Sequence, residues 1–524
     1  MKKRLILLLL CILCICTACG KPELTEVAPI TAAPTEEPTA VPTPEPTPEP
    51  IPFTEAYLML SEPEAFGRLV DTYALTTEYQ GITYWLSKKQ ADAEALLKQY
   101  AAQCELLSAA GYDTTGLLVY IFPNGSDYSD SAEKAVHLNA ETVGTPEAIR
   151  VTLGAILGDY TNAGYLYALS QKICETNADA SPDANVFLQK PELLNLVSPC
   201  FTDPYVDGET LAACQALTLR LLNGMDDPYA GEEAFLKERD AYAAEIGADF
   251  VPTTVRYAYN SKTCPVRAQT YDMEIFLTSD YPEYTLPGYP DLHFDPLFAA
   301  DTMIRFFDVL DAQSKELCRL FRVEKGEYLP VRMTDSYDDG GETGGWFTIV
   351  GNQPMIIARM YFILRHEYVH YMYYRAFGSW EESNLLWCNE ALAYWYGRID
   401  MFEIQYLYAQ QSPYSTAVWA EFLGEAFDTP EDYVTYCNIS ARWILDTEGR
   451  NALRYDLKKP LGGNKESFGG YFIETYGEQA FIDCMVDPTQ AEILFGKTVD
   501  EIVEDWMDWL PPLTDKQREI MAED

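Results

Sequence analysis

Apolar residues gather in blocks along this chain, and two such blocks follow each other in its second half. The first, MIIARMYFILRHEYVHYMYYRAFG (355–378), is apolar nearly all round apart from Arg359, Arg365 and the polar groups of RHEYVH. The second, LLWCNEALAYWYGR (385–398), carries a single acid, Glu390. Both patterns predict buried helices. The glycine and polar residues of RAFGSWEESN, which lies between them, indicate a turn.

Helices and β-type runs precede the apolar blocks in an order that occurs twice. In the first half, the helical pattern 90–112 leads to the strand LLVYIF, then to EKAVHLN and the apolar block 148–173. In the second half, the helical pattern 312–321 leads to EYLPVRM, then to the edge-type run WFTIV and the apolar block 355–378. The order predicts an α+β fold, and we hypothesise an old duplication whose first copy has no metal ligands, since VTLGAILGDY contains no histidine. The alternative is that α+β proteins repeat such an order without common descent.

The first 52 residues indicate export. MKKRLILLLLCILCICTAC has a basic start, an apolar core too short for a comfortable membrane span, and small residues before Cys19. CTAC resembles a bacterial lipobox, which implies that residues 1–19 contain a lipoprotein signal peptide, cleaved before a lipid-bearing Cys19. An uncleaved anchor or a plain secretory signal is the alternative. Residues 20–52, rich in Pro, Thr and Glu, cannot bury a core and are expected to form a disordered, extended spacer.

The remaining chain is longer than one hydrophobic core usually holds. We therefore expect two domains, 53–264 and 265–524, with the boundary near residue 265. The first would be an α+β domain without a metal site. The second would carry the chemistry.

Composition narrows the choice of partners. The net charge is −44, from 81 acidic and 37 basic residues, which argues against nucleic acid or an anionic lipid surface as a partner. Of the 13 cysteines, four lie in the signal region and nine are scattered without a C-x-x-C pair. This odd set predicts no disulfide framework.

Two histidines of RHEYVHYMYY raise the question of a metal site. His366 and His370 are two of only four histidines in the chain, and Glu367 stands between them. Residues four apart lie on one face of a helix, so both imidazoles can reach one metal ion. In zinc hydrolases with this H-E-x-x-H arrangement, the ion lowers the pKa of a bound water to about 7 and the glutamate takes its proton.

Burial adds a reason for a metal. Two histidines and a glutamate inside a buried helix are costly to desolvate unless they are paired or bind an ion. A further ligand is needed, and Glu390 lies in the next apolar block.

These residues resemble a known family. His366, Glu367 and His370, followed by Glu390 in NEALAYW, look like the gluzincin metallopeptidases, especially the peptidase MA-like group with its W-x-x-E-G-x-A helix. The resemblance implies a zincin-type catalytic domain with one zinc ion held by His366, His370 and Glu390. A water at the fourth position would be activated by Glu367 as general base. Ala391 departs from the glycine often found after the glutamate, but alanine is also small.

Other parts of the family pattern are less sharp, although the similarity extends from about residue 300 to 512. Gluzincins place an edge strand where WFTIV lies, and such a strand binds an extended peptide main chain to main chain. An ordinary core strand is the alternative. Related enzymes stabilise the oxyanion with a downstream tyrosine or histidine. Tyr433, Tyr436 and Tyr455 are candidates by their distance along the chain.

The resemblance implies a membrane-anchored extracellular zinc metallopeptidase, tethered through Cys19 and acting on peptides or proteins. A G-x-M-E-N type stretch for gripping a free amino terminus is not evident, which favours an endopeptidase. Two alternatives stay open: a surface binding or scaffold lipoprotein that retains the zincin fold with little peptidase activity, and a zinc hydrolase acting on a non-peptide bond. The presence of Glu367 favours an enzyme, because a structural zinc site needs ligands but no base.

Overall fold

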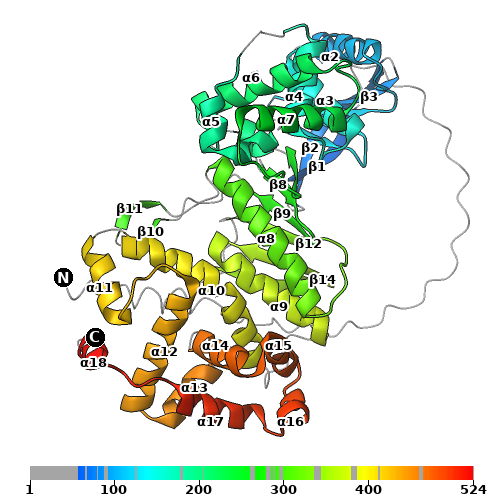
Figure 1. Cartoon of the computed structure of the whole chain (residues 1–524). Helices are drawn as coiled ribbons and strands as arrows, with labels where there is room; N and C mark the ends of the chain where they lie inside the picture. Colours follow the sequence, from blue (N-terminus) through cyan, green and yellow to red (C-terminus); the bar gives the residue numbers. More distant parts are fainter. Residues whose placement is uncertain are drawn as a thin grey trace, which may run out of the picture. The chain divides into compact units, whose positions relative to one another are not determined.

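The computed structural model describes most of the chain after residue 56 (Figure 1). The predicted signal peptide, Cys19 and the spacer 20–52 lie outside the described residues. Within the described part of the chain, a helix with the length and apolar character of a membrane span is not found. The described residues are 57–64, 68–79, 81–87, 93–123, 127–176, 181–202, 205–259, 266–278, 285–286, 289–293, 299–334, 344–378, 386–410, 413–459 and 464–522.

The chain divides into two compact units. Among the described residues, the amino-terminal unit takes 57–159 and 170–176, and the carboxy-terminal unit takes 160–169 and the residues after 176. This division lies well before the expected boundary near residue 265. Residue 265 falls between two strands, β7 and β8, that pair in one sheet, so the hydrogen bonds of that sheet join the two sides of the expected boundary.

A six-stranded sheet forms the core of the amino-terminal unit. Its order is β1-β2-β3-β4-β6-β5, in which β3, β4 and β6 are parallel and the other neighbours antiparallel. Tyr84, Val119 and Val136 form one fully buried row across three of these strands, and two helices complete the core. The elements are β1 (Tyr57–Glu64), β2 (Arg68–Tyr79), β3 (Ile82–Ser87), α2 (Ala93–Ala109), β4 (Leu118–Phe122), β5 (Tyr128–Asp130), β6 (Ala135–Asn139) and α3 (Pro146–Leu157).

A second six-stranded sheet lies in the carboxy-terminal unit. Its order is β13-β14-β12-β9-β8-β7, in which β9, β12 and β14 are parallel and the other neighbours antiparallel. The predicted position of WFTIV at a sheet edge is confirmed, because β13 is the last strand of the order. The elements are β7 (Arg256–Tyr259), β8 (Val266–Gln269), β9 (Met273–Leu277), α8 (Ala300–Leu320), β12 (Leu329–Met333), β13 (Gly345–Val350), β14 (Gln353–Ala358) and α9 (Leu364–Phe377).

The two sheets have the same topology. Each begins with three antiparallel strands, crosses through a helix to a parallel strand, and ends with an antiparallel edge strand beside a further parallel strand. The buried row also recurs, since Ile275, Val331 and Ile356 occupy the positions that Tyr84, Val119 and Val136 hold in the first sheet. The duplication hypothesis predicts such agreement. One detail of that hypothesis is corrected: EKAVHLN contains β6, the counterpart of β14, and the edge strand of the first sheet is β5.

The prediction of one helix over the apolar block 355–378 is wrong. The block begins in β14, which pairs with β12 on one side and β13 on the other, and the helix α9 starts only at Leu364. A strand buried among neighbours is apolar on both faces, so its pattern resembles that of a buried helix. Gly351 and Asn352, with φ of 57° and 79°, form the two-residue turn that joins β13 to β14.

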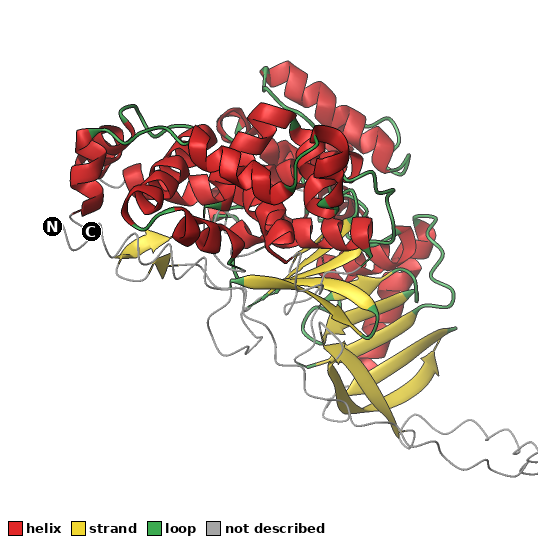
Figure 2. Ribbon diagram, turned by 90° about the horizontal axis from the view of Figure 1, so that it is seen from below, coloured by secondary structure: helices red, strands yellow, loops and turns green. Residues whose placement is uncertain are grey.

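Helices make up most of the remaining chain. The strands are yellow in Figure 2, and those of the described residues that belong to neither six-stranded sheet form the short hairpin of β10 (Thr285–Leu286) and β11 (Tyr289–His293). The further helices are α4 (Ala163–Ile173), α5 (Ala184–Gln189), η1 (Pro191–Asn195), η2 (Ser198–Phe201), α6 (Gly208–Gly224), α7 (Glu232–Ile246), η4 (Tyr361–Ile363), α10 (Leu386–Gln410), α11 (Pro413–Leu423), α12 (Pro430–Thr447), α13 (Arg450–Lys458), α14 (Lys465–Tyr476), α15 (Glu478–Val486), α16 (Thr489–Phe495), α17 (Val499–Trp509) and α18 (Asp515–Ala522).

Candidate metal centre

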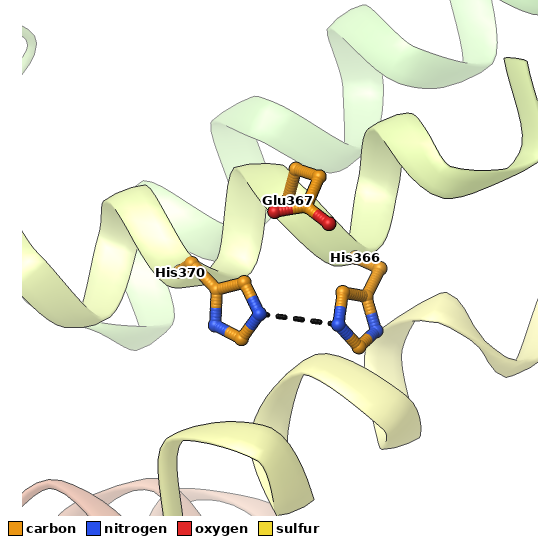
Figure 3. A group of neighbouring side chains, drawn as sticks. All are labelled: His366, Glu367 and His370. Atoms are coloured by element: carbon orange, nitrogen blue, oxygen red, sulfur yellow. Dashed lines mark hydrogen bonds between the residues drawn. The ribbon is translucent and has the colours of Figure 1, made fainter. Parts of the chain in front are cut away.

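Helix α9 presents both predicted histidines on one face. The Nε2 atoms of His366 and His370 lie 3.1 Å apart and point toward one another (Figure 3). Both side chains are buried. The helical prediction around the two histidines is therefore confirmed, and the spacing of four residues does bring the two nitrogens to one point.

Glu390 reaches the same point from α10, which also confirms the predicted second helix. Its Oε2 lies 3.5 Å from Nε2 of His366, and its Oε1 lies 3.7 Å from Nε2 of His370. Glu390 is buried, and its Oε2 has no hydrogen-bond partner among the described residues. A carboxylate oxygen buried without a hydrogen bond is costly, so the arrangement calls for a cation.

Glu367 lies beside the histidines but is held differently. Its Oε2 accepts a hydrogen bond of 2.7 Å from the backbone N–H of Phe347 on the edge strand β13. Its side chain is buried. The edge strand thus orients one oxygen of this carboxylate, which distinguishes Glu367 from Glu390.

The histidine–glutamate group could hold a metal ion. Ligand atoms of His366, Glu367 and His370 lie within 4.8 Å of one another, and all three residues are buried. Two nitrogen ligands of one tetrahedral ion at about 2.0–2.1 Å would lie roughly 3.3 Å apart, close to the separation of the two Nε2 atoms. The distances of Glu390 from both nitrogens fit the same coordination sphere, so the residues present fit a metal.

Asn389 is a polar neighbour of the histidines that the sequence pattern did not indicate. Nδ1 of His370 donates to Oδ1 of Asn389 over 2.9 Å, and both side chains are buried. A donor bond from Nδ1 fixes the ring orientation and leaves the lone pair of Nε2 for an ion. The signal that could have found it is its place directly before Glu390, on the helix that faces α9.

Charges around Glu390 favour its ionised form. Burial on its own would raise the pKa of Glu390, but His370 and His366 outweigh that effect and lower the pKa. Lys465 adds to the lowering. The carboxylate is therefore negatively charged near neutral pH, as a metal ligand must be.

Buried polar contacts hold the two helices of the site in place. Behind α9, the hydroxyl of Tyr368 donates to Asp272 at the start of β9, 2.7 Å from its Oδ2. Between the helices, Nη1 of Arg365 lies 3.0 Å from Oδ1 of Asp400 on α10. These contacts fix the rotation of α9 and its register against α10.

The tyrosines considered as oxyanion stabilisers lie in different surroundings. Tyr433 is buried with its hydroxyl 3.4 Å from Oε1 of Glu466, and Tyr436 packs against Tyr433 and Trp419. Tyr455 is 71 % exposed on α13.

Comparisons of the chain with protein-family models, curated proteins and solved structures find no match.

Proposed function

We propose that the protein is a zinc-dependent hydrolase of peptide bonds. The proposal rests on one observation: His366, His370 and Glu390 converge on one buried point, with the carboxylate of Glu367 beside it. Zinc is the expected ion, since two imidazole nitrogens and one carboxylate are a ligand set typical of catalytic zinc sites. Bound there, zinc would supply Lewis-acid chemistry, lowering the pKa of water and polarising a carbonyl group.

Glu367 acts as the general base in this proposal. The N–H of Phe347 donates to its Oε2, and the carboxylate held in this way would accept a proton from the attacking water and later pass it to the leaving amine. The backbone hydrogen bond holds the carboxylate in place without a flexible partner.

The edge strand supports a peptide as substrate. The N–H of Phe347 points away from β14, because it donates to Glu367 instead of to the neighbouring strand. Backbone groups alternate along an antiparallel strand, so Ile349 faces the same open side. An extended peptide could add to β13 through such groups, with its scissile carbonyl near the histidines.

The test separates the base from the ligands. In the full chain, Glu367→Gln should keep zinc and the melting midpoint while peptide cleavage falls by about 10² to 10⁴. His366→Ala combined with His370→Ala should remove the zinc as well. Glu474→Gln, on an exposed position of α14, is the matched control and should leave both zinc content and cleavage unchanged.

The outcomes discriminate between the functional alternatives. Equal cleavage by wild type and Glu367→Gln would refute the mechanism. If the wild type binds zinc but cleaves nothing in a broad peptide library, the scaffold lipoprotein is favoured. Cleavage of esters or of amides other than peptides, without cleavage of peptides, would favour a non-peptide hydrolase.

We also propose that a lipid on Cys19 anchors the enzyme to the bacterial cell membrane, on its extracellular side. Support comes from the CTAC stretch and the apolar residues before it. Cys19→Ser should release the chain from membranes. Retention that resists salt washing would mean that the amino terminus itself spans the bilayer.

A further inference from the structure

Helix α14 brings a buried lysine close to the metal centre. Lys465 is the first residue of α14, and its side chain is 0 % exposed. Lysine is almost never fully buried unless its charge is compensated. Its Nζ lies 4.9 Å from the ring centre of Tyr394 on α10.

The close approach of α14 follows from the sequence of that helix. Gly469 faces Trp395, and a Cβ at Gly469 would lie 2.9 Å from Cε3 of the indole ring. Only glycine allows the two helices to pack at this distance. The amino-terminal end of α14 is thereby held against the part of α10 that carries Glu390.

Tyr394 links Lys465 to the metal centre. Its ring meets the His366 ring edge to face, with the ring centres 4.9 Å apart and the planes at 89°. Tyr394 also follows Glu390 by one helical turn, so the two residues share a face of α10. The ammonium group and the His366 ring therefore both contact the same aromatic ring, that of Tyr394.

We propose that Lys465 is a built-in counter-charge that regulates metal loading. In the metal-free protein its ammonium group compensates the buried Glu390 carboxylate, so the site can fold before an ion arrives. Once an ion is present, the same positive charge repels it and weakens its binding. The inference rests on the metal site proposed above.

Two consequences of removing the charge run in opposite directions. Lys465→Met keeps the length of the side chain, so we expect the metal-free protein to melt at a lower temperature but to bind zinc more tightly. At an effective dielectric constant of about 20, a unit charge within about 13 Å of a divalent ion changes its affinity by roughly 70-fold or more. A mere packing defect would lower both quantities. Lys465→Arg retains the charge and should stay close to wild type in both.

A double-mutant cycle with Glu390 tests the compensation without any metal. The fall in metal-free melting temperature caused by Lys465→Met should largely disappear in the Glu390→Gln background, because no carboxylate is left to compensate. Should Lys465→Met alone not fold, the double variant is still expected to fold. Glu466→Gln is the comparison for the neighbouring buried acid, and its coupling to Lys465→Met shows how much of the effect belongs to Glu466.

The experiment distinguishes this inference from the proposed function. Zinc affinity would be measured in the full chain by competition with a chromophoric chelator, and melting by calorimetry with and without chelator. Absence of zinc binding by wild type would sink the proposed function, while coupling of Lys465 to Glu390 would still support the compensation. Additive effects of the two substitutions, or zinc binding by Lys465→Met that is no tighter than in wild type, would overturn the counter-charge.

Discussion

The ion pair between α9 and α10 can be tested by removing its two charges separately and together. Arg365 precedes His366, and Asp400 lies further along the helix that carries Glu390. Their closest atoms are 3.0 Å apart, and the two side chains are 4 % and 0 % exposed. Solvent therefore cannot replace a missing partner, in contrast to the ion pairs on the surface.

The expected loss in the free energy of unfolding follows from this burial. Removing one member of a buried pair leaves an uncompensated charge and costs about 3 to 5 kcal/mol, whereas replacing both by apolar residues is often neutral or stabilising. We expect this cost for Arg365→Met and for Asp400→Leu. Asp400→Leu should lie nearer the lower value, because the remaining guanidinium still lies 5.6 Å from the ring centre of Phe306.

Calorimetry is the suitable assay, since the chain has two compact units that need not unfold in one step. At about 2 °C per kcal/mol for a large unit, each single variant should lower the transition of the carboxy-terminal unit by roughly 6 to 10 °C. The double variant should recover most of that loss. Arg319→Met, which removes an exposed pair with Glu316, is the control and should shift the transition by little. Single variants that melt like wild type, or a double variant whose loss equals the sum of both, would refute the reasoning.

Three further predictions concern the surroundings of the site. Asn389→Ala should weaken zinc binding about 10- to 100-fold in a chelator competition, because His370 loses the acceptor that orients its ring. Burial raises the pKa of Glu466 to about 7, above its ordinary value of 4.5, so the folded state binds this proton more tightly than the unfolded chain. This proton binding adds to the free energy of unfolding below about pH 4.5, and the contribution, about 3 kcal/mol, is lost as the pH rises through 7. Glu466→Gln should remove this part of the pH dependence in melting experiments. Gly469→Val should cost about 1 to 3 kcal/mol in the same assay, since its side chain would overlap Trp395.

The metal helix was readable from the sequence because its chemistry is local. A spacing of four residues fixes the angle between His366 and His370 once a helix forms, whatever the rest of the fold does. Local spacing does not place Glu390 at the site, because its position depends on how α10 packs on α9. Only the resemblance to a family predicted that packing. The edge position of β13 was predicted on the same basis.

The contacts around the site could not be predicted from the sequence, for the opposite reason. Phe347, Asn389 and Lys465 meet their partners across element boundaries, and their positions depend on strand register and helix rotation. The local pattern around them is that of ordinary strand and helix residues. The apolar run of β14 was likewise misassigned, because periodicity cannot separate a strand buried on both faces from a buried helix.

The shared topology of the two sheets bears on whether a lost site can be regained. In the carboxy-terminal unit, α9 reaches its edge strand with the long carboxylate side chain of Glu367. In the amino-terminal unit, α3 reaches the corresponding strand β5 with bare backbone: a Cβ at Gly154 would lie 2.7 Å from the hydroxyl oxygen of Ser129. The Ser129 side chain there occupies the room that a catalytic side chain on α3 would need. If the units share an ancestor, new chemistry at Gly154 would therefore require Ser129 or the helix to move as well.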